Sequence, residues 1–140
     1  MNRRRRTEIL IKGSTEIAKK MFIEIGEKYE VKIIEEPNNG LVMTKMREEA
    51  QKSLFYLGEV LVTEAKVQIN GKLGIGIVRG NETELSYWLA VIDAAYNADL
   101  EETKSWQKLL EDEEKRIDEE MRKYNSRVLK TRVNFATMDN

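Results

Sequence analysis

Residues 56–80 read YLGEVLVTEAKVQINGKLGIGIVRG, and this stretch decides the fold. Two runs rich in Val, Ile and Leu flank Asn70-Gly71, the dipeptide that a two-residue type I′ turn favours because both of its residues need positive φ. The pattern predicts an antiparallel hairpin at the centre of a sheet. Before the turn, the alternation slips by one position near Glu64, which predicts a β-bulge over residues 63–65.

The second arm of the hairpin contains Gly74 and Gly76, two residues apart. Side chains alternate between the two faces of a strand, so both glycines face the same side of the sheet and leave a shallow slot there. We expect a backbone, a helix or a ligand to approach closely at this slot.

The segment before the hairpin extends the predicted sheet. Residues 29–36 and 41–46 each alternate, and residues 37–40 (PNNG) between them combine several turn-forming residues. This pattern predicts two further strands joined by a turn. The expected fold class is α+β, with a four-stranded, mainly antiparallel sheet from about Tyr29 to Arg79 and helices before and after it.

Helical periodicity precedes the sheet. Residues 3–11 predict a short helix that Gly13 stops, and Ser14 opens a second helix whose apolar residues keep helical spacing. Gly26 lies where this second helix is expected to fail. The apolar face of the second helix is predicted to cover one face of the sheet.

Helical periodicity also follows the sheet. Asn81 with Glu84 has the character of a capping box before a third helix over residues 85–96. Residues 101–129 predict a long charged helix with one narrow, heptad-like apolar seam, which suggests packing against a partner. Residues 130–140 change texture again and are expected to form an extended, partner-binding tail. The whole chain, 1–140, is predicted to be a single domain.

Composition limits the chemistry available to this chain. Its 140 residues include no Cys and no His, which excludes Cys or His zinc sites, iron-sulfur ligation, a thiolate nucleophile and an imidazole base. The net charge of −1 provides no overall field for nucleic acid or an anionic membrane, and no apolar run approaches the roughly 20 residues that cross a bilayer. We expect a cytoplasmic chain without nucleic-acid or membrane partners.

Three charged features are candidates for function. Arg79 and Gly80 end a strand before a helix, where free N–H groups would suit a phosphate, although no phosphate-loop motif opens that helix and a purely structural junction is the alternative. Asp93 interrupts an apolar helix and is either exposed or paired with a basic residue; exposure is favoured because buried Asp is rare. The basic run 3–6 is expected to be solvated, with phosphate binding as the alternative.

Five stretches in order resemble one family. They are residues 40–42 (GLV), 58–64 (GEVLVTE), 73–80 (LGIGIVRG), 90–94 (AVIDA) and 131–138 (TRVNFATM). Their order, spacing and the matching chain length resemble the G subunit of the bacterial carbon-phosphorus lyase core complex, which degrades phosphonates.

The resemblance implies one component of a cytoplasmic assembly of the G, H, I and J subunits, in which the G subunit is present as a pair. The implied reaction also involves the ATPase-like L subunit and displaces adenine from ATP with a phosphonate, giving α-D-ribose 1-methylphosphonate 5-triphosphate from methylphosphonate. Nucleosidase activity belongs to the I subunit and radical cleavage of the C–P bond to the J subunit. The G subunit is therefore expected to be accessory, with ATP and phosphonate as substrates of the complex and no cofactor bound by this chain alone.

The resemblance also suggests where contacts lie. In the family Cys often follows the Thr-Glu pair, where this chain has Ala65, and Asp often stands in place of Asn134, so catalysis by a thiol or carboxylate at these positions is not expected. No catalytic, cofactor-binding or metal residue is predicted. The candidate contacts with another subunit or with phosphate are Thr63, Glu64, Arg79, Gly80 and Arg132.

Two alternatives remain open on the sequence. The first is a small stand-alone enzyme that acts on a phosphorylated ligand through Asp93, Glu64 or Arg79. The second is a generic interaction module, such as a nucleic-acid-binding module that uses residues 3–6 and the charged helix. The balanced charge disfavours nucleic-acid binding, because phosphate contacts supply most of its affinity.

Overall fold

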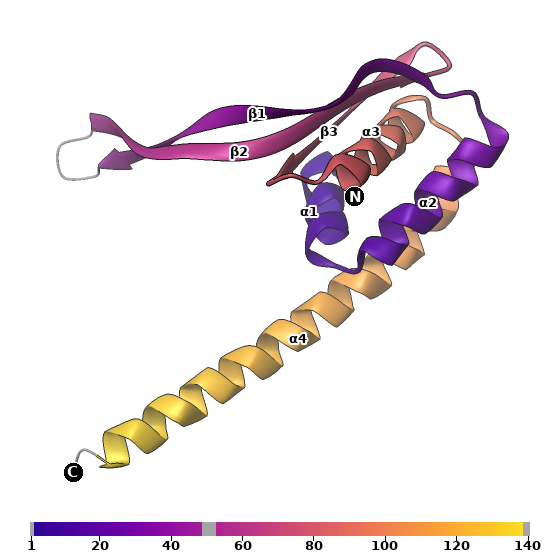
Figure 1. The fold of residues 1–140 in the computed structure, drawn as a ribbon. Helices are drawn as coiled ribbons and strands as arrows, with labels where there is room; N and C mark the ends of the chain where they lie inside the picture. Colours follow the sequence, from indigo (N-terminus) through magenta and orange to yellow (C-terminus); the bar gives the residue numbers. More distant parts are fainter. Residues whose placement is uncertain (1, 49–52, 139–140) are drawn as a thin grey trace.

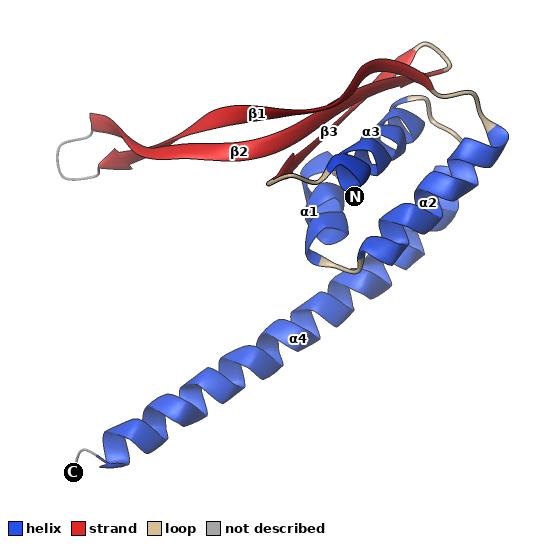
Figure 2. Cartoon of the chain, viewed as in Figure 1, coloured by secondary structure: helices blue, strands red, loops and turns tan. Residues whose placement is uncertain are grey.

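The computed structural model describes residues 2–48 and 53–138 (Figure 1). Its fold is α+β, and its sheet has three antiparallel strands in the order β1-β2-β3. The helices lie on one side of the sheet, and α4 projects away from the body (Figure 2). The elements in chain order are α1 (Arg3–Lys12), α2 (Thr15–Lys28), β1 (Lys32–Glu48), β2 (Ser53–Ile69), β3 (Lys72–Arg79), α3 (Thr83–Asn97) and α4 (Glu102–Met138).

The predicted hairpin is confirmed, but its expected place at the centre of the sheet holds only for β2, because β3 is an edge strand. Asn70 and Gly71 have φ of 49° and 80° and form the two-residue turn between β2 and β3. The pairing of these strands is continuous from Val62 opposite Arg79 to Ile69 opposite Lys72. A type I′ turn fixes this register, because its twist matches that of the flanking strands.

The predicted bulge at residues 63–65 is wrong for β2. Thr63, Ala65, Val67 and Ile69 are all buried, so the inward-facing positions keep a strict period of two. The apparent slip in the sequence arises because a threonine occupies an inward position. The irregularity lies in β1 instead, where two residues between Glu35 and Asn38 face the single residue between Glu64 and Lys66.

The prediction of four strands is also wrong, because residues 37–40 do not form a turn. β1 runs through them as one strand of 17 residues. Pro37 lies at the register shift on an edge strand, where a missing N–H costs no ladder hydrogen bond. The Asn38 side chain donates to the carbonyls of Glu36 and Glu64 and to the Glu35 carboxylate, so it stabilises the bulge.

The glycine slot on β3 is filled by helix α3. A Cβ on Gly74 would lie 2.2 Å from the carbonyl oxygen of Ala90, and one on Gly76 would lie 2.0 Å from that of Ser86. The helix backbone therefore rests directly on the strand backbone. Ala94, also on the contacting face of α3, is fully buried. Small residues on both elements allow this close approach.

The helix ends partly follow the prediction. Gly13 ends α1, and the Ser14 side chain caps α2 by accepting from the Glu16 N–H. α2 continues past Gly26 to Lys28, since an exposed glycine costs a helix only about 1 kcal/mol. The predicted Asn81 cap of α3 is wrong, because the capping position is Glu82 and its side chain makes no cap hydrogen bond.

Helix α4 is continuous to Met138, so residues 130–138 are helical and not an extended tail, while 139–140 fall outside the described residues. Trp106 and Leu110 anchor its first turns in the core, and the Trp106 indole donates to Glu24 of α2. Further along, Met121 and Tyr124 are 57% and 64% exposed. With 37 residues, the helix is roughly 55 Å long, and its outer part extends beyond the body (Figure 1).

Candidate functional site at the outer edge of β3

Strand β3 forms one edge of the sheet, so half of its main-chain groups point away from β2. In an antiparallel ladder, residues that bond to the neighbour alternate with residues that point outward. The Gly80 N–H donates to Leu61 of β2, whereas the Ile75 N–H donates to a side chain on α3. The odd-numbered residues of β3 from Leu73 to Arg79 therefore present their main-chain groups to the outer edge.

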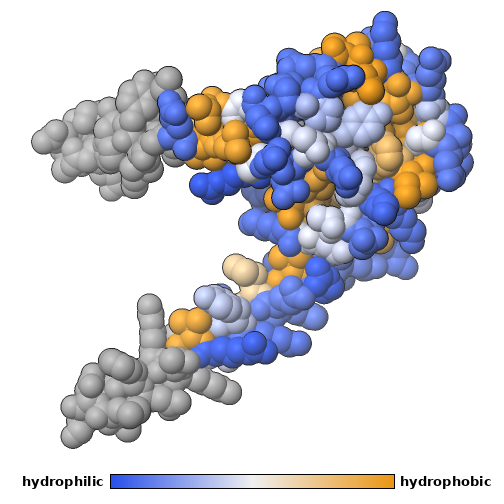
Figure 3. All heavy atoms as spheres, in the orientation of Figure 1, coloured by the Kyte–Doolittle hydropathy of each residue, from blue (hydrophilic) through white to orange (hydrophobic). Residues whose placement is uncertain are grey.

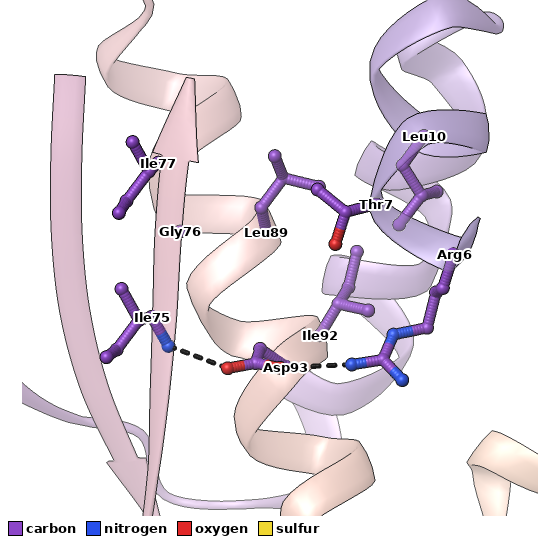
Figure 4. A pocket seen from close by; sticks show the side chains of 9 residues that line it. All are labelled: Arg6, Thr7, Leu10, Ile75, Gly76, Ile77, Leu89, Ile92 and Asp93. Atoms are coloured by element: carbon purple, nitrogen blue, oxygen red, sulfur yellow. Dashed lines mark hydrogen bonds and ion pairs between the residues drawn. The ribbon is translucent and has the colours of Figure 1, made fainter. Parts of the chain in front are cut away.

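Two side chains of α3 occupy one end of this edge. The Ile75 N–H donates to Asp93 Oδ2 at 2.9 Å (Figure 4), and the Asn97 side-chain amide donates to the Leu73 carbonyl at 2.7 Å. Asp93 and Asn97 are four residues apart and therefore lie on the same face of the helix. Helix α3 therefore caps the turn-proximal part of the edge.

Asp93 is the centre of an ion-pair cluster. Its side chain is buried, and its two carboxylate oxygens accept from Arg3 at 2.8 Å and from Arg6 at 3.0 Å. Arg6 is also buried, and its guanidinium lies 3.8 Å from the centre of the Tyr96 ring. The favoured prediction that Asp93 is exposed is wrong, and the alternative of a basic partner is confirmed.

Burial sets the electrostatics of this cluster. Desolvation lowers the pKa of the Arg6 guanidinium, and the negative charge of Asp93 opposes that shift. Burial likewise raises the pKa of the Tyr96 phenol, against the opposing charge of Arg6. Because the Asp93 carboxylate accepts from two guanidinium groups and a main-chain N–H, the cluster is suited to joining α1, α3 and β3.

The basic run of α1 is structural as well. Arg5 forms a bidentate pair with Glu114 of α4, and its Nε lies 2.7 Å from the carboxylate. Arg4 lies 3.5 Å from Glu8 within α1. The expectation of a solvated segment is therefore wrong for Arg6, which is buried, whereas Arg5 is exposed as well as paired. The sequence does contain a sign of this, since a lone Asp in an apolar helix needs a basic partner when it is buried.

A gap separates the outer edge of β3 from α1. Above Asp93 it narrows to a cavity of about 20 Å³, into which Leu89 and Ile92 of α3 and Thr7 of α1 project (Figure 4). It widens outward into a groove of about 420 Å³. This groove is lined by Arg3, Arg4, Thr7, Glu8, Ile11, Ile75 and Ile77.

Of the predicted contact residues, Thr63 and Gly80 come together. The Thr63 hydroxyl accepts from the Glu82 N–H at 2.9 Å and donates to the Gly80 carbonyl at 2.6 Å, with Asn39 Oδ1 at 3.2 Å. Gly80 has φ of 89°, which favours glycine at this bend. Thr63 therefore joins β2 to the start of α3. Its hydroxyl occupies the strand–helix junction at which the sequence suggested a phosphate site.

The other predicted contact residues, Glu64, Arg79 and Arg132, do not form one site with Thr63 and Gly80. Glu64 lies 3.5 Å from Lys66 on the same strand. Arg79 is exposed on β3, opposite Val62. Arg132 belongs to the outer part of α4, and its side chain lies outside the described residues. Among described residues, no group of three or more Asp and Glu side chains is placed to hold a metal ion.

Apolar surface gathers on the two projecting parts of the molecule. Figure 3 shows hydrophobic residues along the sheet where it extends past the body and along the outer half of α4. Among the side chains that the structure describes, Leu41, Val42 and Leu61 are exposed in the first patch, and Met121 and Tyr124 in the second. None of the described helices is both long enough and apolar enough to cross a membrane.

Comparisons with known proteins agree with one another. The family described as "Phosphonate metabolism protein PhnG" matches residues 1–139. A curated relative, the "Alpha-D-ribose 1-methylphosphonate 5-triphosphate synthase subunit PhnG" of Rhizobium meliloti (strain 1021), is 31% identical over 115 residues. These residues cover 81% of this chain and 73% of the relative.

Proposed function

The chain belongs to the PhnG family of phosphonate metabolism proteins, and from this premise we propose that it is an accessory subunit of a ribose 1-methylphosphonate 5-triphosphate synthase. In this role it supports the transfer of a phosphonate to the ribose C1 of ATP with release of adenine. The observation that carries the proposal is the family match over nearly the whole chain, together with a relative whose name describes it as a subunit of that enzyme.

The geometry of the chain favours an accessory role over a catalytic one. Asp93 is the carboxylate that interrupts the apolar helix α3. It accepts hydrogen bonds from Arg3, Arg6 and the Ile75 N–H, so its role is to stabilise the fold. A stand-alone enzyme, the alternative above, is therefore left with Glu64 or Arg79. The long helix α4 and the projecting sheet instead present apolar surface, which typically marks sites of protein interaction.

The proposed partners follow from the resemblance of the sequence to the G subunit of the carbon-phosphorus lyase complex. They are the H, I and J subunits of that complex and the ATPase-like L subunit, in a cytoplasmic assembly that contains this chain as a pair. ATP and the phosphonate are substrates of the assembly, and this chain alone binds no cofactor.

The candidate contact residues divide by accessibility. Arg79 and Glu64 have side chains that a partner can reach, so we retain them as proposed subunit contacts. Thr63 and Gly80 act through the local fold that positions Arg79. Arg132 stays a predicted contact on α4. Arg79→Ala should leave the isolated chain folded and weaken its assembly, whereas Lys104→Ala, an exposed control on α4, should not.

Co-purification tests the proposed function. The chain is co-expressed with an affinity-tagged H, I or J subunit from the same source, and the eluate is analysed by native mass spectrometry. The proposal predicts stoichiometric recovery of the chain in an assembly with these subunits. A folded chain that stays monomeric in their presence would show that the proposed role is wrong.

A further inference from the structure

We propose that the outer edge of β3, from Ile75 to Arg79, receives an extended segment of a companion subunit as a fourth strand of the sheet. The inference rests on the proposed function, because it names the contact surface through which this chain joins the same assembly. Neither the family match nor the name of the relative assigns a contact to this edge.

The main-chain groups of β3 provide the first support. The odd-numbered residues point away from β2, and Asn97 and Asp93 satisfy the Leu73 carbonyl and the Ile75 N–H. The remaining outward main-chain groups have no hydrogen-bond partner within the described part of the chain. They are the Ile75 carbonyl, the N–H and carbonyl of Ile77, and the Arg79 N–H. An exposed row of this kind is a template for another strand.

The groove beside this row provides the second support. A strand added to a sheet lies about 4.8 Å from its neighbour, which places it between β3 and α1, where the groove of about 420 Å³ lies. Ile77 and Ile11 are 50% and 41% exposed on its walls, so alternate apolar side chains of an incoming segment have surfaces to cover. Main-chain bonds then supply affinity, and the groove selects the side chains.

Charge argues for a companion subunit over a second copy of this chain. Among the charged residues that line the groove, Arg3 and Arg4 outnumber Glu8, which pairs with Arg4, and the exposed Arg79 lies at the end of the edge. Two copies paired through β3 would bring these like charges together. An extended segment with alternating apolar residues and an acidic residue facing Arg79 complements the surface instead.

Hydrogen exchange at single amides tests the inference on the full chain. In the isolated chain, the amides of Ile77 and Arg79 should exchange quickly, whereas those of Gly76 and Val78, which face β2, should be protected. In the assembly with companion subunits, Ile77 and Arg79 should exchange at least about tenfold more slowly, as expected for amides that acquire a hydrogen bond.

A proline pair gives an independent test. Ile77→Pro removes an outward N–H that bonds to nothing described in the isolated chain, and proline is tolerated at such edge positions. Leu73→Pro is the matched control, since it removes an outward N–H at the turn end of the same strand, outside the groove. Ile77→Pro should weaken assembly by about tenfold, and Leu73→Pro should leave it unchanged.

The outcomes separate this inference from the function on which it rests. An assembly in which the Ile77 and Arg79 amides still exchange quickly overturns the strand addition and leaves the proposed function intact. Protection of Ile77 in the isolated chain that disappears on dilution assigns the edge to a second copy and also overturns it. A chain that never assembles overturns both proposals.

Discussion

The carboxylate of Asp93 accepts a hydrogen bond from the main-chain N–H of Ile75 at 2.9 Å, so a side chain of α3 reaches around the edge of β3. The same carboxylate binds Arg3 and Arg6 of α1. One residue therefore fixes the helix that covers the sheet, the edge of the sheet and the N-terminal helix. Asp93 thus contacts both α1 and β3, the two elements that line the groove.

Asp93→Ala should lower the free energy of unfolding by about 3–5 kcal/mol, because it leaves the buried guanidinium of Arg6 without its counter-charge. Denaturant unfolding of the full chain measures this change. Asp112→Ala, an exposed control on α4, should change it by less than about 0.5 kcal/mol. A double-mutant cycle with Arg6→Ala should show that the second substitution costs much less once Asp93 is gone.

Gly74→Ala and Gly76→Ala should each destabilise the fold by about 3 kcal/mol, because the added methyl group meets main-chain atoms of α3 that cannot move independently. Gly40→Ala is the matched control in the same sheet, since no atom lies within 4 Å of the added Cβ. Thermal and denaturant unfolding give the comparison. Equal stability of the three variants would contradict direct contact between the backbones of α3 and β3.

Thr63→Val should cost about 2 kcal/mol of unfolding free energy. The valine keeps the shape of the side chain but leaves the Glu82 N–H and the Gly80 carbonyl without their hydroxyl partner. Thr63→Ser retains the hydroxyl and should recover most of the hydrogen-bond contribution. If the serine and valine variants unfold at the same denaturant concentration, the hydroxyl does not hold the start of α3.

Acid should weaken the contact between α1 and α4. The hydrogen bond and charge of Arg5 hold the pKa of Glu114 below its ordinary value of 4.5. The ionised carboxylate is thus favoured by folding, so its contribution is present above pH 4.5 and is lost as the pH falls through the lower folded-state pKa. The stability difference between the protein and Glu114→Gln should shrink over that window in pH-dependent unfolding.

Glu119→Gln is the control for the pH experiment. Glu119 is exposed on the same helix and makes no ion pair with any described residue. Its substitution should produce no comparable pH-dependent difference. A difference between Glu114→Gln and the unchanged protein that stays constant down to about pH 2 would contradict the linkage.

The hairpin and most helix boundaries were predictable because local chemistry determines them. Asn70-Gly71 specifies its turn, and Gly13 and Ser14 mark a helix stop and start that the structure contains. The glycine slot on β3 was also visible from the spacing of Gly74 and Gly76. What occupies the slot was not, because α3 reaches it only through tertiary packing.

The errors came from features that depend on distant residues. Pro37 predicts a turn in the sequence. In the structure it lies on an edge strand, beside a bulge that Asn38 stabilises, and β1 therefore continues through it. Asp93 was expected to be exposed because buried Asp is rare, and its partners, Arg3 and Arg6, lie about 90 residues away in the chain. Local periodicity contains no information about such a pairing.

The resemblance to the family came from the order of short stretches, and the structure places two of them in the same region. Residues 73–80 form the β3 edge, and residues 90–94 contribute Asp93 beneath it. Residues 131–138 lie instead on the outer part of α4. The stretches that carry the resemblance thus include both the edge that we propose as a binding surface and the residue that shapes it.

Adenine release from ATP in the presence of methylphosphonate tests the accessory role most directly. The reaction is measured with this chain alone, with the companion subunits alone and with the complete set. The chain alone should release no adenine, and the complete set should release it faster than the companions without this chain. Adenine release by the isolated chain, or an equal rate with and without it, would contradict an accessory role.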